Sequence, residues 1–533
     1  MSCTKSYYLF QPETIHHKEK SAIVLCILLI VPALLINLGL LAVIEDEAIR
    51  ALVALEMWYS GDYIAPTLNA IPYYNKPPLY NWIILVSYTV FGNADEFSLR
   101  FPAALSTFLY GLCIYLIYKK EMSKLAAISV TLLAITCGRI FFYDSFHGLI
   151  DMTFSMCMFS LMLGSYQLAR QKAWTKMFAF AYGLASVGFL LKTLPALVFL
   201  GLSLLLILIV EREFKRFFSL PHFIGIGLFI LIVGGYYFAY SINHDIVALF
   251  KKMLTESTDR TVVKFGIGKT IAHFITFPSE VFVHFLPWTV LCIYIFKISY
   301  LKKLWNHEFL RMNILLLIVN ILLYWVSPQV YARYLLMFPP LIFAPLYYLH
   351  RLHQEENTIH YRVVKGLMIL LTVLIGLGMF AVFFIQELAF IPHIYIKAST
   401  VCLLIMVAAY LFITAPKFRL VYIFLFVVIF RIGFDWFVLP HRNANDYSDI
   451  LRKSAIETSQ KYKGQSIYAQ ESGLFRGVSY YLTRETKRII PATKNPVNGL
   501  LITFEKEKES CKKIGNLKSR VPSNDYLVLE CKE

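Results

Sequence analysis

The sequence predicts a mainly α-helical, polytopic membrane protein with about thirteen spans and a small α+β domain at its C-terminus. Three observations predict this fold class. The chain has 533 residues, of which 58% are hydrophobic and only 16% are charged, a balance outside that of soluble domains. Apolar runs of about twenty residues, the length that crosses a bilayer, recur up to residue 438. Beyond Pro440 the chain becomes polar and contains short segments rich in β-branched and aromatic residues.

The excess of basic residues follows the membrane pattern as well. The chain has 51 Lys and Arg against 34 Asp and Glu, a net charge of +17. In a soluble domain this charge would suggest nucleic-acid binding. Here most basic residues lie in short loops between apolar runs, where the positive-inside rule accounts for them. No nucleic-acid partner is therefore expected.

The first span fixes the orientation of the rest. Residues 1–20 form a basic leader that is expected in the cytoplasm, and the apolar run 21–44 is long enough to cross the bilayer. No small-residue cleavage site follows this run, so we expect it to remain as a membrane helix. Placing each basic loop inside then completes a transmembrane domain of residues 21–438. The further spans are expected at 98–118, 125–142, 151–169, 177–191, 194–211, 222–241, 281–298, 313–327, 334–350, 365–386, 395–414 and 419–438.

Two long segments are expected on the outer side. Residues 45–95 contain four prolines that break any single helix, and the short apolar stretch 79–91 is interpreted as an interfacial or re-entrant helix. Residues 242–280 carry an excess of positive charge, against the positive-inside rule. A phosphate-bearing lipid would account for this charge. A solvated amphipathic helix without a ligand would account for it too.

An odd number of spans places residues 439–533 outside, as a periplasmic α+β domain. It contains no constellation typical of catalysis, which favours a lid or a docking module. Cys511 and Cys531 both lie here, and an oxidising compartment permits a disulfide between them. Residues 446–462 have the pattern of an amphipathic helix. Short strands are expected at 466–470, 486–490, 498–503 and 525–531.

Candidate catalytic carboxylates follow the first span. Asp46 and Glu47 belong to a run of three carboxylates at the membrane surface, which is costly unless the charges are solvated, paired or used. Two structural interpretations compete with catalysis: Asp46 as the N-cap of the next helix, and Glu47 as the ion-pair partner of Arg50. Asp151 is a further candidate, and it too could be an N-cap.

Candidate phosphate-binding residues lie in three predicted outer segments. Lys76 is held between prolines, where it can contact a phosphate or extend to lipid headgroups. Arg260 lies in the second outer loop, and Arg333 with Tyr334 lies in a third. Arg and Tyr also act as headgroup anchors. The candidates that share the outer face on this topology are Asp46, Lys76, Asp151, Arg260 and Arg333.

Short motifs follow one another in a characteristic order. They are Asp46-Glu47-Ala48, Ser60-Gly61-Asp62-Tyr63, Pro66-x-Leu68-Asn69, Pro72-Tyr73, Lys76-Pro77-Pro78-Leu79, Phe97-x-x-Arg100-x-Pro102, Asp151-Met152, Phe285-Leu286-Pro287-Trp288 and Arg333-Tyr334-Leu335-Leu336. In order and spacing they resemble the aminoarabinose transferase and protein mannosyltransferase superfamily over most of the membrane region. The resemblance fades in the C-terminal domain.

This resemblance implies a GT-C fold with its active site on the extracytoplasmic side and a donor sugar carried on polyprenyl phosphate. Carried over by position, Asp46 resembles the essential carboxylate of the first loop and Asp151 the second acidic position. Lys76 and Arg260 resemble the contacts to the lipid phosphate, and the loop that holds Arg260 varies in length within the family.

One departure concerns a metal. Aminoarabinose transferases usually have Glu before the Lys-Pro motif and His in the second large loop, which together bind zinc. This chain has Asn75 at the first position and no His between His244 and His273. We therefore expect this zinc site to be absent and the donor or acceptor to differ. The sequence leaves open another divalent cation.

The expected function is an integral-membrane hexosyl- or pentosyltransferase of the bacterial inner membrane. It would move a sugar from polyprenyl phosphate to lipid A or another envelope glycolipid, or alternatively to a protein. A transporter or lipid flippase is the rival from another class, and it would need ionisable residues or broken helices near the bilayer midplane. The polar clusters lie instead at the outer ends of the predicted spans. A non-catalytic assembly protein is a third alternative.

Overall fold

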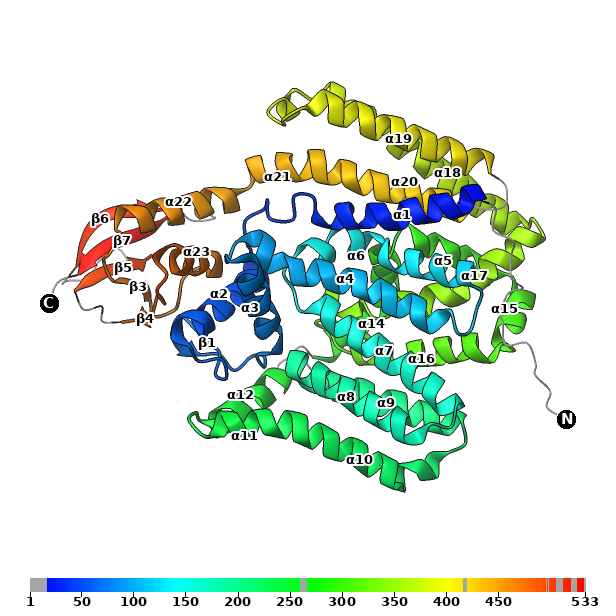
Figure 1. The fold of residues 1–533 in the computed structure, drawn as a ribbon, viewed down its shortest axis with the longest axis horizontal. Helices are drawn as coiled ribbons and strands as arrows, with labels where there is room; N and C mark the ends of the chain where they lie inside the picture. The colour runs from blue at the N-terminus through cyan, green and yellow to red at the C-terminus, as the bar shows by residue number, and fades with distance from the viewer. Residues whose placement is uncertain are drawn as a thin grey trace.

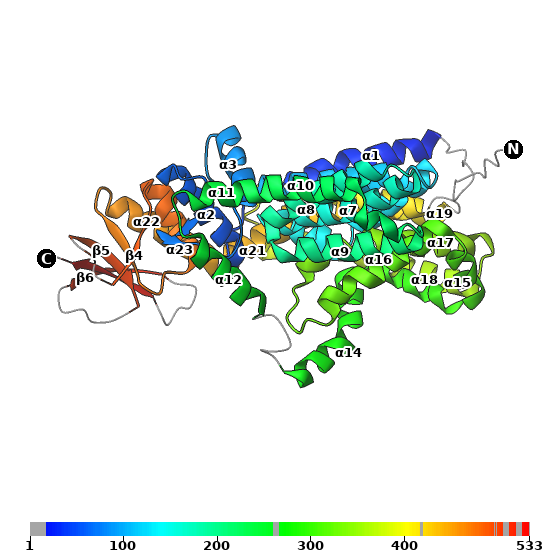
Figure 2. The same cartoon turned by 90° about the horizontal axis from the view of Figure 1, so that it is seen from below.

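The computed structural model describes residues 17–258, 266–415, 419–494, 496, 498–504, 511–518 and 525–531. These residues form an elongated body of helices with a small sheet domain at one end, and α1 begins at the opposite end (Figures 1 and 2). The mainly helical fold class with an α+β C-terminal domain is confirmed.

The described helices of the first half are α1 (His17–Leu35), α2 (Glu45–Ser60), α3 (Leu79–Phe91), α4 (Glu96–Tyr118), α5 (Lys124–Ile135), α6 (Gly138–Phe142), η1 (Asp144–Phe146), α7 (Asp151–Arg170), α8 (Trp174–Lys192), α9 (Leu194–Val210), η2 (Phe214–Phe218), α10 (Leu220–Phe229), η3 (Ile230–Gly234), α11 (Gly235–Ser241) and α12 (Ile246–Thr258). Those of the second half are α14 (Ile267–His284), η4 (Trp288–Phe296), α15 (Ile298–Trp305), α16 (Glu308–Trp325), η5 (Ala332–Leu335), α17 (Pro339–Glu355), α18 (Ile359–Met379), η6 (Phe380–Phe383), η7 (Gln386–Leu388), α19 (Ile394–Thr414), α20 (Arg419–Gly433), η8 (Phe434–Val438), α21 (Leu439–Asn445), α22 (Tyr447–Lys461) and α23 (Arg476–Thr486).

The helical body contains several membrane spans. Within the described ranges, seven helices are long and apolar enough to cross a bilayer, or eight if the bent pair Lys124–Ile135 and Gly138–Phe146 is one span. The chain is therefore a multi-pass membrane protein. The number of thirteen spans stays a prediction.

Three predicted spans differ from the structure, and the one expected at 125–142 is bent by 54° between Lys124–Ile135 and Gly138–Phe146. The first helix ends at Leu35 rather than at residue 44, and Asn37 has a φ of 55°, a left-handed conformation that does not continue a helix. The expected span at 281–298 is divided between α14, η4 and α15. Pro287 lies at this division and cannot donate the backbone hydrogen bond that a continuous helix requires.

The first outer loop folds around a buried carboxylate. α2 ends at Gly61, which has a φ of 74°, and the chain then forms the hairpin β1 (Thr67–Leu68) and β2 (Ile71–Pro72). Glu56 is buried and accepts hydrogen bonds from Thr67 Oγ1 at 2.7 Å, the Asn69 amide at 2.5 Å and the Ala70 amide at 3.1 Å. Because Asn69 and Ala70 have φ values of 55° and 61°, these bonds hold the hairpin tip in a conformation that non-glycine residues rarely adopt.

The C-terminal domain is a mixed sheet with two helices. Its strands are β3 (Ile467–Gln470), β4 (Ala492–Thr493), β5 (Gly499–Thr503), β6 (Cys511–Leu517) and β7 (Tyr526–Cys531), in the order β4-β3-β5-β7-β6. β3 pairs in parallel with β4 and β5, and β7 pairs antiparallel with β5 and β6. Cys511 and Cys531 face each other in register and form the disulfide that the sequence permitted.

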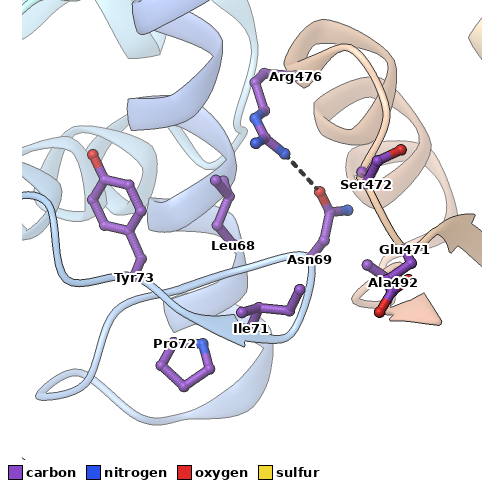
Figure 3. Close-up of a pocket in the computed structure, with 10 residues that line it drawn as sticks. Leu68, Asn69, Ile71, Pro72, Tyr73, Glu471, Ser472, Arg476 and Ala492 are labelled. Carbon is purple, nitrogen blue, oxygen red and sulfur yellow. Dashed lines mark hydrogen bonds between the residues drawn. The ribbon is translucent and has the colours of Figure 1, made fainter. Parts of the chain in front are cut away.

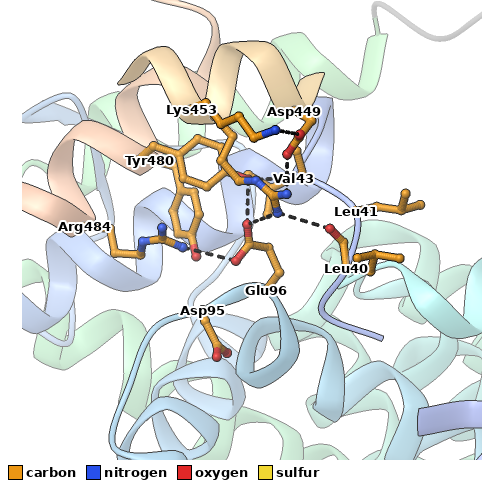
Figure 4. A network of polar contacts seen from close by, with 12 residues as sticks. Leu40, Leu41, Val43, Asp95, Glu96, Asp449, Lys453, Tyr480 and Arg484 are labelled. Carbon is orange, nitrogen blue, oxygen red and sulfur yellow. Dashed lines mark hydrogen bonds and ion pairs between the residues drawn. The ribbon is translucent and has the colours of Figure 1, made fainter. Parts of the chain in front are cut away.

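Several hydrogen bonds join this domain to the membrane domain, including one from the Tyr480 hydroxyl to the Ala94 carbonyl, and two of the contacts form networks. At the first, Glu96 at the start of α4 accepts hydrogen bonds from Arg452 and Tyr481 through Oε1 and from Arg484 through Oε2, at 2.9 to 3.1 Å (Figure 4). We call this network the Glu96 junction. At the second, the Asn69 side chain donates hydrogen bonds to Ser479 Oγ at 3.1 Å and to the Ile490 carbonyl at 2.9 Å.

A small cavity of about 140 Å³ lies beside the second contact, between the hairpin and the C-terminal domain. Figure 3 shows Arg476 reaching across to the Asn69 side chain at the edge of this cavity. The first outer loop and the C-terminal domain are therefore packed together at one end of the molecule (Figure 1).

Candidate functional site

Four charged side chains from distant parts of the sequence meet in one cluster. Asp46 lies in the first turn of α2 and pairs with Arg333 of η5. Arg333 Nε also lies 3.8 Å from Asp151 Oδ2, and the other oxygen of Asp151 accepts a hydrogen bond from Lys192 at the end of α8. We call Asp46, Asp151, Lys192 and Arg333 the charge cluster. Two carboxylates and two cations balance within it.

The local backbone explains how these residues are aimed. The N-cap residues of α2 and α7 are Ile44 and Ile150, and neither helix has a side-chain cap. The N-cap interpretation of Asp46 and Asp151 is therefore wrong, and both carboxylates are free to point toward the basic residues. Thr193 has a φ of 62° and interrupts the helix between α8 and α9, so Lys192 is the last residue of α8.

Aromatic rings complete the surroundings of the two cations. The Arg333 guanidinium carbon lies 4.5 Å from the centre of the Tyr331 ring and 5.7 Å from that of Tyr334. Lys192 Nζ lies 4.5 Å from the centre of the Tyr334 ring. Aromatic faces attract cations. Tyr334, a predicted site residue, therefore interacts with both cations of the cluster.

Glu47 lies behind the cluster in a buried ion pair. It accepts hydrogen bonds from Arg100 Nε and Nη2 at 2.7 and 2.9 Å and from the Gly148 amide at 2.7 Å. Its partner is therefore Arg100 rather than Arg50, which corrects the alternative drawn from spacing. Burial alone would raise the pKa of Glu47, but the charge and hydrogen bonds of Arg100 outweigh burial, so the pKa is lowered.

Lys76 lines a cavity that none of the four charge-cluster residues lines. It shares this small cavity with Tyr73, Tyr74, Pro66, Pro77, Tyr236, Tyr237, Leu249 and Met253. Tyr73 connects this cavity to α2, because its hydroxyl accepts a hydrogen bond of 2.6 Å from Arg50 Nη2. Arg260 lies outside the described residues, so its role as a phosphate contact stays a prediction.

Sequence reasoning missed Lys192 and gave Arg100 no role. Lys192 is the single basic residue in the short predicted outer turn between the apolar runs 177–191 and 194–211. A lysine at such a place breaks the positive-inside rule, and this signal could have found it. Arg100 stood in a recognised motif, but its distance of 53 residues from Glu47 hid the pairing.

Comparisons with known proteins bear on the family and the fold of this chain. A family model described as dolichyl-phosphate-mannose-protein mannosyltransferase matches residues 75–236. An undecaprenyl phosphate-α-4-amino-4-deoxy-L-arabinose arabinosyl transferase of Pseudomonas savastanoi pv. phaseolicola is 32% identical over 163 residues, which cover 29% of this chain and 30% of the relative. An uncharacterized protein of Aquifex aeolicus is 26% identical over 219 residues, which cover 40% of this chain and 43% of the relative. The chain thus matches less than half the length of these curated relatives.

The crystal structure of ArnT from Cupriavidus metallidurans bound to undecaprenyl phosphate superposes with a TM-score of 0.68 over 96% of this chain and 98% of that one, at 16% identity. Its apo form gives a TM-score of 0.67. This is a GT-C fold of the aminoarabinose transferase type. The resemblance seen in the sequence motifs is therefore confirmed, and the ArnT-like fold extends over the C-terminal domain, where the motifs fade.

The residues present do not fit the zinc site that is usual in aminoarabinose transferases. Asn75 offers an amide where those enzymes have a carboxylate. Within the ranges that the structure describes, no three His, Cys, Asp or Glu side chains are grouped so as to hold a metal ion.

Proposed function

We propose that this protein transfers a sugar from a polyprenyl-phosphate donor to an acceptor at the outer face of the bacterial inner membrane. The observation that carries the proposal is the charge cluster, in which Asp46 and Asp151 share Arg333 within an ArnT-like fold. The matched family and the named relatives use lipid-phosphate-linked sugars according to their descriptions. The C-terminal domain is proposed to be periplasmic and to stand over this site.

The reaction would be a direct displacement at the anomeric carbon. An acceptor oxygen forms the new bond to this carbon while the bond to the phosphate oxygen breaks, and polyprenyl phosphate leaves with the electron pair. Cations that are already in place stabilise the departing charge without reorganisation. Lys76, Arg260 and Arg333, with Tyr334 beside Arg333, are proposed for the phosphate, and removing one such donor typically costs about 3 kcal/mol, or a hundredfold in rate.

Asp46 is the proposed general base. Its side chain is 52% exposed, so an acceptor can reach it from solvent, and it forms an ion pair with Arg333. If the acceptor is a hydroxyl, Asp46 takes its proton during attack. If the acceptor is an anionic phosphate, Asp46 has no proton to take and positions the acceptor instead. Asp151, buried between Lys192 and Arg333, would keep both cations oriented.

Glu47, a candidate catalytic carboxylate in the sequence, is proposed to act as a positioning residue. Its oxygens are taken up by Arg100 and Gly148, and Arg100 also donates to the carbonyl groups of Leu38 and Leu41. The pair thus fastens the turn before α2 to α4. This would hold Asp46 at a fixed place beside the helical body.

An envelope glycolipid such as lipid A is the proposed acceptor, because the predicted topology puts Asp46 and Arg333 at the outer membrane surface. The test is mass spectrometry of lipid A and of total envelope glycans from three strains: one with the wild-type protein, one without it, and one with Asp46→Asn. We expect one sugar-modified species that is present only with the wild-type protein. Identical profiles in all three strains would refute the proposed activity. A modified protein instead of a modified lipid would show that the acceptor is a protein.

A further inference from the structure

Arg50 is a buried arginine that has no anionic partner among the described residues. It lies four residues after Asp46 on α2, and residues four apart share one face of a helix. Only 7% of its surface is exposed. Nη2 donates to the Tyr73 hydroxyl at 2.6 Å, whereas Nη1 is buried and has no hydrogen-bond partner among the described residues. Within the same residues, Arg50 belongs to no ion pair.

An arrangement of this kind is unfavourable in the free protein. Burying a charged group costs free energy unless a counterion and hydrogen bonds compensate it. Arg100, equally buried, shows the compensated case: it pairs with Glu47 and donates to three backbone carbonyl groups. The charge cluster offers Arg50 no spare counterion, because Asp46 and Asp151 are already paired with Arg333 and Lys192. The positive charge of Arg50 is therefore in surplus beside the site.

A second donor without a partner lies nearby. Tyr80 on α3 is fully buried, and its hydroxyl makes no hydrogen bond to any described residue. Its helix α3 packs against α2, which carries Asp46 and Arg50. Arg50 and Tyr80 therefore flank the same region as the charge cluster. Tyr73 adds the link to Lys76, since it also lines the cavity of that lysine, and Figure 3 shows its hydroxyl directed away from the hairpin tip.

We propose that Arg50, Tyr73 and Tyr80 form a subsite for an anionic group of the substrate, held one helical turn from Asp46. The group would be a carboxylate or a phosphate, because the planar guanidinium fork matches both. The source is either a carboxylate on the transferred sugar, as in a uronic acid, or a phosphate on the donor or acceptor lipid. This inference deepens the proposed function and rests on it, since it treats the charge cluster as the reacting site.

The experiment measures binding, so it does not depend on transfer activity. Full-length protein in nanodiscs is unfolded by heat with glucuronate, inorganic phosphate or neutral glucose as the probe. Wild type is compared with Arg50→Gln, Arg50→Lys and Arg488→Gln, the last a control at an exposed arginine of the C-terminal domain. We expect at least one anion, but not glucose, to raise the Tm of wild type and of the control. In Arg50→Gln the affinity for this anion should fall about tenfold or more, and in Arg50→Lys less.

A second readout separates a binding role from a structural one. Without any anion, Arg50→Gln should have a Tm equal to or above that of wild type, because the substitution removes a buried charge that nothing compensates. A lower Tm for this variant would show that Arg50 stabilises the fold, and it would overturn the proposal. So would a wild type that responds to neither anion, or an Arg50→Gln protein that responds like wild type.

The source of the anion follows from the same set of proteins. A response to glucuronate that exceeds the response to phosphate assigns the subsite to an acidic sugar. A preference for phosphate assigns it to a lipid phosphate, and titration with undecaprenyl phosphate then tells donor from acceptor: only a donor role predicts weaker binding in Arg50→Gln. Loss of the transfer activity in cells would leave these binding results unaffected, so the two proposals can fail separately.

Discussion

Two ion-pair networks of this protein, the Glu96 junction and the charge cluster, use the same chemistry to different ends. At the junction, both oxygens of a buried carboxylate accept hydrogen bonds from Arg452, Tyr481 and Arg484 (Figure 4). In the cluster, Asp46 is half exposed, and buried donors of Arg50 and Tyr80 nearby have no partner among the described residues. A saturated network holds two parts of a protein together. In an incomplete network, a ligand can supply the missing hydrogen-bond or ion-pair partner.

The largest effect should come from the cluster. Asp46→Asn removes the proposed base and keeps the size of the side chain, so we expect transfer to fall about a hundred- to ten-thousandfold if the acceptor is a hydroxyl. The Tm should stay close to that of wild type, because the side chain is 52% exposed. Transfer is measured with purified protein and the acceptor identified by mass spectrometry. Glu45→Gln, one residue away and exposed, is the matched control, and equal losses in both variants would contradict a specific role of Asp46.

Next is the buried pair behind the cluster. Glu47→Gln leaves Arg100 buried without a counterion, so we expect a loss of about 3 to 5 kcal/mol in stability, measured by chemical or thermal unfolding. The double variant Glu47→Gln/Arg100→Met should recover part of this loss. Since the pKa of Glu47 is lowered in the folded protein, the pair stabilises the fold above the ordinary glutamate pKa. Its contribution should disappear as the pH falls below that value, and a stability that rises on acidification would rule this out.

The Glu96 junction should respond more moderately. In Glu96→Gln an NH2 group, which is a donor, replaces one acceptor oxygen of the carboxylate. At least one of the hydrogen bonds from Arg452, Tyr481 and Arg484 is therefore lost. Hydrogen bonds to charged groups contribute about 1.5 to 3 kcal/mol each. We expect faster proteolysis between α21 and the sheet and a lower Tm, measured by limited digestion and calorimetry. Digestion at the wild-type rate would show that the remaining contacts, such as those of Asn69 and of Tyr480 with the Ala94 carbonyl, are enough to dock the domain.

The smallest effect should be at the rim of that junction. Lys453 pairs with Asp449 at 2.8 Å, but its side chain is 69% exposed. Exposed pairs contribute about 0.2 to 1 kcal/mol because water and salt screen them. Lys453→Gln should therefore change the Tm little, and less still in high salt. A loss as large as that of Glu96→Gln would mean that exposure does not separate the centre of the junction from its rim.

The membrane domain was largely predictable because its signals are local. Apolar length and the placement of basic loops indicate where helices lie, and the motifs around Asp46, Lys76 and Arg333 indicate the fold. Local signals failed where the chain turns. Residues 486–490 were expected to form a strand, but α23 (Arg476–Thr486) ends there and Lys487 has a φ of 55°, a left-handed conformation that does not occur within a strand. β6 was missed as well, since the segment Cys511–Leu517 is partly exposed and basic.

The site was predictable residue by residue but not pair by pair. Asp46, Asp151, Arg333 and Tyr334 were singled out from their types and positions, and the structure brings them together. Which residue pairs with which depends on contacts over long separations, such as the 287 residues between Asp46 and Arg333. The pairing of Glu47 with Arg100 and the surplus charge of Arg50 follow from such contacts, so no local pattern could reveal them.

The hairpin tip at Asn69 bears on how such proteins diversify. Asn69 bonds to Ser479 and Ile490 of the C-terminal domain, while the same loop carries Lys76 toward the membrane. A recombinant that exchanges the C-terminal domain for that of a relative would lose these partners unless residues 45–95 travel with it. The first outer loop and the C-terminal domain therefore form one structural unit, and chimeras designed to change the acceptor should exchange both segments together.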